Sequence, residues 1–165
     1  AVEYAKTHGK LVTYDPNLRK PLWRSLDEAK EQMLWGLRQA DVVKISDEEV
    51  SFLFGDISYE EAAQKLLNEF GIRLVFVTLG KNGCLFANRN AVGTVPALTG
   101  LHTIDTTGAG DAFCAGAAIG LTYGKGLKEA CEIGAMLAAS VIVTSESVCP
   151  RFRPRELGLD MDVED

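Results

Sequence analysis

The sequence predicts an α/β fold with a mainly parallel sheet, and two observations support this prediction. Short apolar segments typical of strands alternate along the chain with segments that carry helix start signals. In addition, residues 74–79, Leu-Val-Phe-Val-Thr-Leu, are nearly all apolar, as expected for a strand buried on both faces of a parallel sheet. The chain of 165 residues is long enough to form one compact domain.

The helices are predicted from their start and stop signals. Ser25, Ser46 and Ser58 each stand three residues before a glutamate, which is the capping-box pattern that opens a helix. Gly9 and Gly71 follow two of the segments as helix stops. The predicted helices cover residues 1–8, 26–39, 46–54, 58–70, 109–123 and 127–144.

The strands are predicted from the short apolar runs between these helices. Pro16 and Pro21 indicate a loop after the first strand, and Gly80 and Gly83 turn the chain after the third. The predicted strands cover residues 10–15, 41–46, 74–79, 84–87 and 91–95, the last two forming a hairpin. Because residues 1–8 resemble the end of a helix, we expect the chain to begin inside a fold. We assign residues 1–145 to one domain and 146–165 to a surface tail.

Composition limits the classes of function. The net charge is −6 and the charges of both signs are interspersed, which argues against a general nucleic-acid surface. The four cysteines have no C-x-x-C spacing, so we expect reduced thiols rather than a metal site or a disulfide framework. The first residues lack a signal-peptide pattern, and the apolar runs are shorter than the ~20 residues that span a bilayer. We therefore expect a cytoplasmic protein that binds neither membrane nor nucleic acid.

A glycine-rich turn before the helix predicted at 109–123 has the clearest chemical meaning. The N–H groups at a helix start carry partial positive charge, and Gly108, Ala109 and Gly110 have little side chain to keep a phosphate away. Asp111 lies in the first turn, where its carboxylate could accept a proton from an attacking hydroxyl. From the residues alone, two simpler explanations stay open: an aspartate that only caps the helix, and small residues that only allow close packing.

Several segments of the chain resemble those of one enzyme family. Residues 105–118 resemble the C-terminal signature of the PfkB, or ribokinase-like, carbohydrate kinases. Residues 14–23, Tyr-Asp-Pro-Asn-Leu-Arg-Lys-Pro-Leu-Trp, are similar to a segment of the fructokinase members, residues 44–49 resemble a strand-to-helix junction, and 77–83 contain a T-x-G-x-x-G turn. The resemblance implies a ribokinase-like three-layer sandwich, of which this chain would be the C-terminal half, without the lid.

The resemblance also implies an activity, the ATP-dependent phosphorylation of a sugar primary hydroxyl, with D-fructose giving fructose 6-phosphate. Asp111 would be the general base, and residues 108–110 with the amide of Asp111 would form an anion hole for the γ-phosphate. Thr78, Gly80 and Gly83 would lie along ATP. The parent protein would bind sugar and ATP as small molecules and could form a homodimer through the missing lid.

Metal and substrate roles are implied in the same way. Glu49 would act on Mg²⁺ through water, Asp105 with Thr107 would help to bind a monovalent cation, K⁺, and residues 135–139 would line the adenine pocket. Arg19 in the loop could bind a sugar oxygen, a substrate carboxylate or the moving phosphate, and a solvated loop arginine stays open as the alternative.

The chain departs from the family pattern at two places, and rival functions stay open. Ser46 stands where the family often has asparagine. Residues 145–149 lack a common glycine, and because backbone carbonyls in that segment usually complete the cation site, the K⁺ dependence of this protein stays open. A 2-keto-3-deoxygluconate kinase is an alternative because Arg19 would suit a carboxylate. Another alternative is a kinase-like regulator that binds nucleotide or sugar without turnover. We expect these 165 residues alone to phosphorylate sugar poorly or not at all.

Overall fold

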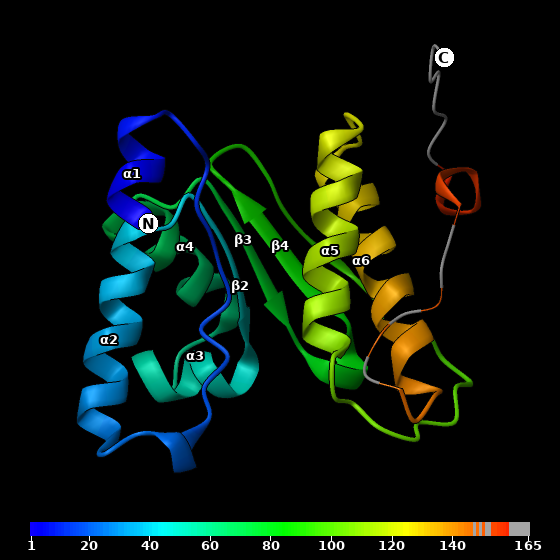
Figure 1. Cartoon of the computed structure of the whole chain (residues 1–165), viewed down its shortest axis with the longest axis horizontal. Helices are drawn as coiled ribbons and strands as arrows, with labels where there is room; N and C mark the ends of the chain where they lie inside the picture. The colour runs from blue at the N-terminus through cyan, green and yellow to red at the C-terminus, as the bar shows by residue number, and fades with distance from the viewer. Residues whose placement is uncertain (147, 149, 151–152, 159–165) are drawn as a thin grey trace. The chain divides into compact units, whose positions relative to one another are not determined.

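A computed structural model describes residues 1–146, 148, 150 and 153–158 of the chain (Figure 1). The chain forms two compact units, Ala1–Thr94 and Val95–Asp165. No helix in the part that the structure describes is both long and apolar enough to cross a membrane. The first unit contains α1 (Val2–Thr7), β1 (Thr13–Tyr14), η1 (Lys20–Leu22), α2 (Leu26–Gln39), β2 (Val42–Ser46), α3 (Asp47–Phe54), α4 (Tyr59–Glu69), β3 (Leu74–Thr78), η2 (Gly80–Asn82) and β4 (Cys84–Asn88), and β5 (Val92–Val95) ends at its boundary.

The strands form one mixed sheet in the order β1-β2-β3-β4-β5. β1 and β2 are parallel, as are β2 and β3, whereas β4 runs antiparallel to β3. The predicted hairpin of β4 and β5 is present, and the N–H of Asn88 donates to the carbonyl of Ala91 across its turn at 2.9 Å. The α/β prediction is therefore confirmed, with a parallel part that is extended by an antiparallel hairpin.

The core of the first unit lies between one face of the sheet and the helices α2, α3 and α4, which Figure 1 shows on the same side of the strands. Alternate residues of β2, β3 and β4 belong to this core, as the two-residue period of a strand requires. The β3 residues from Leu74 to Val77 are all buried, in agreement with the prediction for this strand. The largest core side chains are Met33, Leu37, Ile45, Leu66, Leu67, Ile72 and Leu85.

The predicted helix starts at Ser46 and Ser58 are capping boxes in the structure, with reciprocal bonds between serine and glutamate. The first strand, however, is shorter than the predicted 10–15, because Val12 bonds outside the regular ladder. Its N–H donates to the carboxylate of Asp41 at 2.9 Å, and its carbonyl accepts from the N–H groups of Asp41 and Val42. Pro16, which has no N–H, follows soon after β1.

The second unit is built on two helices, α5 (Ala109–Thr122) and α6 (Leu127–Ile142), which pack at very close range. A Cβ on Gly116 would lie only 2.9 Å from the Cα of Gly134, and one on Gly134 would lie 2.8 Å from the carbonyl oxygen of Phe113. A Cβ on Gly120 would lie 3.0 Å from the Cα of Ala130. Close packing therefore explains the small residues in the middle of α5.

The described part of the tail contains the short helix η3 (Pro154–Leu157). Leu157 is half-buried and packs against Ala112, Leu137 and Val141 of the helix pair. This residue therefore contacts the second unit's core, while Arg155, Glu156 and Gly158 beside it are exposed.

Candidate active site

The predicted site residues fall into two groups, one in each unit. In the first unit they lie where the parallel strands β1, β2 and β3 end. Asp15 follows β1, Ser46 ends β2, and Thr78 ends β3 directly opposite Ser46 in the register. Because the carboxyl ends of parallel strands share one edge of a sheet, the fold gathers these three segments there, at the usual ligand-binding edge of α/β proteins.

Glu49 is the buried acid of this edge, with only 5% of its surface exposed. One carboxylate oxygen, Oε2, accepts a hydrogen bond from the N–H of Ser46 at 2.8 Å and completes the capping box of α3. The other oxygen, Oε1, accepts from the N–H of Leu18 at 2.7 Å. A carboxylate has about four lone-pair sites, so these two bonds leave acceptor capacity for a water molecule.

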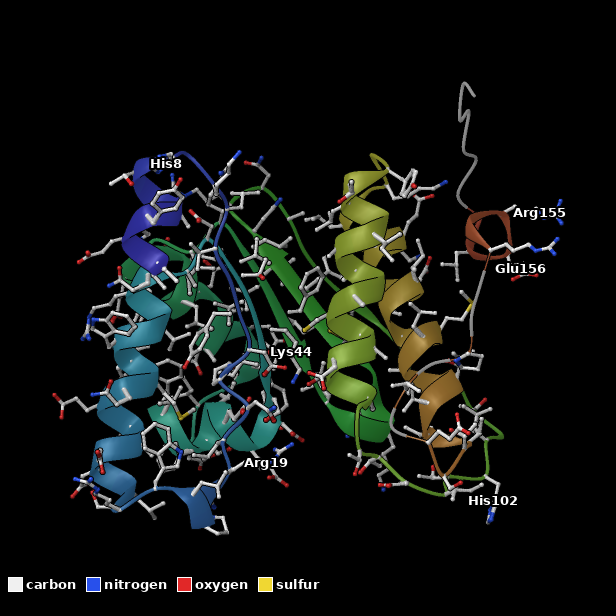
Figure 2. The ribbon with its side chains drawn as sticks, viewed as in Figure 1. His8, Arg19, Lys44, His102, Arg155 and Glu156 are labelled. Carbon is white, nitrogen blue, oxygen red and sulfur yellow. The ribbon has the colours of Figure 1, made fainter. Side chains whose placement is uncertain are left out.

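The loop from Asp15 to Arg19 is fixed at several points. The Lys44 Nζ donates to both oxygens of Asp15, at 3.1 and 3.3 Å, and both side chains are largely buried. Asn17 has a φ of 47°, a left-handed conformation that asparagine tolerates, and its N–H donates to Asp15 Oδ1 at 3.2 Å. Leu18 packs on the core, and Arg19 is exposed at the next position (Figure 2). The scaffold thus presents an arginine from a firmly held loop.

Burial and charge both act on the acids of this edge. Burial raises the pKa of Asp15, while the nearby Lys44 ammonium opposes the shift and Glu49 adds to it. Burial also raises the pKa of Tyr14, and the charges of Glu49 and Asp15 add to that shift. Asp15, Lys44 and Glu49 are therefore one electrostatically connected group.

The turn after β3 has the backbone conformation that its glycines allow. Gly80 and Gly83 have φ values of 52° and 96°, in the region that favours glycine. The N–H of Leu79 donates to the carbonyl of Gly83 at 2.8 Å and closes the turn. Thr78 directs its hydroxyl to the carbonyl of Ile45 at 3.5 Å, so it links β3 to β2.

The site residues of the second unit lie at the start of α5. Gly108 is the N-cap residue and has a φ of 84°. The N–H of Ala109 donates to Thr106 at 3.2 Å and that of Ala112 donates to Gly108 at 2.9 Å. Within the described residues, the backbone bonds outside the regular elements include none donated by Gly110 or Asp111. Two amides at the positive end of the helix are thus open to an anion, beside the exposed carboxylate of Asp111.

Asp105 organises the loop before this helix start. Its Oδ1 accepts from both the N–H and the hydroxyl of Thr107, each at 2.9 Å. Both bonds lower the pKa of Asp105, and the bond from the N–H has the larger effect. The preceding N–H, from Ile104, donates to the carbonyl of Ile142 at 2.7 Å and ties the loop to the end of α6.

Over the described ranges, no group of three or more His, Cys, Asp or Glu residues is placed to hold a metal by itself. Glu49 and Asp105 each keep unused acceptor sites, and one carboxylate suffices for an Mg²⁺ ion that arrives with phosphate ligands. The residues present therefore fit a metal that enters together with a nucleotide. In the segment 145–149, which lacks the glycine common in the family, residues 147 and 149 lie outside the described residues.

Sequence reasoning missed two features of the site. The first is the ion pair of Lys44 with Asp15, for which a lysine inside a predicted strand is the available signal, because a buried lysine needs an acidic partner. The second bond of Glu49, to Leu18, had no sequence signal because its donor is a backbone N–H. On α6, Leu137 is buried, and the predicted adenine-side residues around it are half-buried.

Parallel strand ends gathered at one edge, and a helix start with open amides beside an acid, are features of α/β proteins that bind phosphate-bearing ligands. Comparison with known families makes this class specific. Residues 1–151 match the pfkB family carbohydrate kinase, and the chain belongs to this family.

Relatives of known name agree with this assignment. The chain is 46% identical over 113 residues to fructokinase-1 of Zea mays and 45% identical over 115 residues to fructokinase-2 of Solanum lycopersicum, covering 68% of this chain in both cases. It spans 35% and 34% of the length of these two relatives. Among solved structures, a fructokinase double mutant from Vibrio cholerae O395 in fructose, ADP and potassium ion bound form aligns with a TM-score of 0.80 and 34% identity, covering 89% of this chain and 49% of the other.

Proposed function

We propose that the protein to which this chain belongs transfers the γ-phosphoryl group of ATP to a primary hydroxyl of a sugar, with D-fructose as the substrate and fructose 6-phosphate as the product. The observation that carries the proposal is the start of α5, where the amides of Gly110 and Asp111 are open and the Asp111 carboxylate is exposed. The plant relatives and the Vibrio cholerae protein support the choice of fructose.

In this proposal each group has one task. The Asp111 carboxylate accepts the proton of the attacking hydroxyl, which makes the sugar oxygen a better nucleophile. The open amides at the start of α5 stabilise the charge on the transferred phosphoryl group, aided by the helix dipole. Thr78, Gly80 and Gly83 lie along the nucleotide.

Two cations belong to the proposal as well. Mg²⁺, when bound with ATP, would neutralise phosphate charge, and Glu49 would orient one of its waters. Asp105 and Thr107 would take part in holding a monovalent cation, as the potassium-bound form of the Vibrio cholerae relative suggests.

A second candidate is phosphorylation of a sugar acid such as 2-keto-3-deoxygluconate. It is favoured by Arg19, which is exposed and takes part in no ion pair among the residues that the structure describes. A guanidinium held in this way suits a carboxylate, which it can bind with two parallel hydrogen bonds.

The test is a coupled assay of ADP release with the full-length gene product, Mg·ATP and a panel of fructose, 2-keto-3-deoxygluconate, ribose and adenosine. Release that depends on fructose would support the proposal, and release with the keto acid alone would select the second candidate. ATP binding without release on any substrate would instead favour a non-catalytic regulator. The chain alone, which spans about half of the aligned structure, is proposed to turn over slowly or not at all.

Replacing Asp111 by alanine in the full-length protein tests the assignment of the base. Loss of a general base lowers kcat by about 100- to 10,000-fold. ATP binding should be largely retained, because the open amides come from the backbone. Activity close to wild type in a folded Asp111→Ala variant would show that another group is the base.

A further inference from the structure

Two helices of the first unit begin with the same capping box, but the two glutamates are used differently. At α4, Glu61 is exposed. In the described structure its carboxylate accepts hydrogen bonds only from Ser58, from the N–H at 2.9 Å and from the hydroxyl at 2.8 Å. At α3, Glu49 is buried and divides its two oxygens between Ser46 and Leu18. Helix capping accounts for the first oxygen of Glu49 and leaves the second unexplained.

The partner of this second oxygen lies 31 residues away in sequence, in the loop that carries Arg19. The bond is short, 2.7 Å, and a carboxylate acceptor makes it stronger than a bond between neutral groups. It also fixes the backbone directly between Asn17, which is in a left-handed conformation, and the exposed Arg19. A left-handed residue is retained where its surroundings hold it, and Glu49 supplies one such hold.

We propose that Glu49 is a positioning residue for substrate binding, because it locks the Asp15–Arg19 loop through the Leu18 N–H and so fixes where Arg19 is presented. This inference rests on the proposed kinase function for its catalytic consequence, but the lock itself is a property of the folded chain. It adds to the water-mediated role of Glu49 on Mg²⁺, since the carboxylate retains acceptor sites.

Removal of the bond from Leu18 to Glu49 would loosen the second half of the loop. Without it, the Leu18 N–H would lose its buried acceptor, and the loop would sample other conformations in order to hydrate that group. The Asp15–Lys44 pair would still hold the start of the loop, so the change would be confined to its second half. Arg19 would then spend only part of its time in the binding position, and the apparent substrate affinity would fall in proportion.

The first test measures amide hydrogen exchange in the 165-residue chain by NMR. In the wild type, the Leu18 amide should exchange far more slowly than that of Arg24, for which the structure shows no backbone hydrogen bond outside the regular elements of the described residues. In Glu49→Ala, the exchange rate of Leu18 should rise by about 10- to 100-fold. Glu61→Ala is the matched control, because it removes a capping glutamate that tethers no loop, and it should leave Leu18 unchanged.

The second test uses kinetics of the full-length protein with Arg19→Ala, Glu49→Ala and the double variant. Each single change should raise the KM for the sugar by about tenfold or more. Because Glu49 acts on the substrate through Arg19, Glu49→Ala should add no further rise in sugar KM when Arg19 is already absent. Any Mg²⁺ role of Glu49 would appear separately, in kcat and in the dependence on Mg·ATP.

The outcomes separate the lock from the function. Fast exchange of Leu18 in the wild type overturns the lock, even if Glu49→Ala fails to fold. Unchanged exchange in a folded Glu49→Ala variant also overturns it, as do sugar KM effects that multiply in the double variant. A wild-type protein that releases no ADP with any sugar defeats the proposed function, while slow Leu18 exchange that depends on Glu49 would still establish the lock.

Discussion

The contact between α5 and α6 allows a stability prediction in which two effects have opposite signs. Replacing Gly116 by alanine would place a Cβ 2.9 Å from both the Cα of Gly134 and the carbonyl oxygen of Ile133. These are backbone atoms, which cannot move aside as the end of a flexible side chain can. The two helices must therefore separate locally.

The magnitude follows from a comparison of strain with helix propensity. Alanine is favoured over glycine inside a helix by about 1 kcal/mol. Overpacking of a close contact costs about 1–3 kcal/mol, and contacts with backbone on the opposite helix place Gly116 in the upper part of this range. We therefore expect Gly116→Ala to lower the free energy of unfolding by about 1–2 kcal/mol.

The assay is urea unfolding of the chain, followed by far-ultraviolet circular dichroism. Ala115→Gly, on the exposed face of the same helix, calibrates propensity without touching the interface, and it should cost about 1 kcal/mol. If Gly116→Ala instead stabilised the chain by the same amount, propensity alone would decide and the inferred close contact would be wrong.

Two further predictions concern the partly buried Asp15 and the tail. Because burial raises the pKa of Asp15, its NMR titration should lie above the usual value of 3.8, and Lys44→Met should raise it further. The folded state then binds the Asp15 proton more tightly than the unfolded chain does. The free energy of unfolding, measured relative to Asp15→Asn, should therefore be greatest below the pKa of Asp15 in the unfolded chain and fall as the pH rises through its pKa in the folded state. A titration of Asp15 at or below 3.8 would contradict this expectation. Leu157→Ala should lower the free energy of unfolding by about 1 kcal/mol, because that side chain is half-buried on the helix pair. The exposed Leu98 is its matched control, and an equal loss in Leu98→Ala would show that the tail contact contributes nothing.

Helix starts were the part of the fold that could be predicted most sharply, because their signal is local. The serine and glutamate of each capping box lie within one turn, so Ser46 and Ser58 identify their helices without knowledge of the rest of the chain. The first strand was predicted too long, since Asp41, which is distant in sequence, takes the hydrogen bond of Val12. Local patterns do not contain such competition.

In the candidate site too, local features could be predicted from the sequence, whereas contacts between distant segments could not. The loop that starts α5 could be located from Gly108 and Asp111, and the structure places both at the helix start as expected. The pairing of Asp15 with Lys44 and the bond from Leu18 to Glu49 join segments 29 and 31 residues apart, and they depend on how β1 and β2 are aligned.

The glycine contact between α5 and α6 also has a mechanical consequence. Helices whose backbones touch cannot slide past each other without steric conflict, and the bond from Ile104 to Ile142 ties the far end of α6 to the segment that leads into α5. The 16 residues of α6 make a rod about 24 Å long. A displacement of the end of α6 opposite Ile142 would therefore tilt the helix and move the amides at the start of α5. A ligand or mutation distant from Asp111 could in this way change the alignment of its carboxylate.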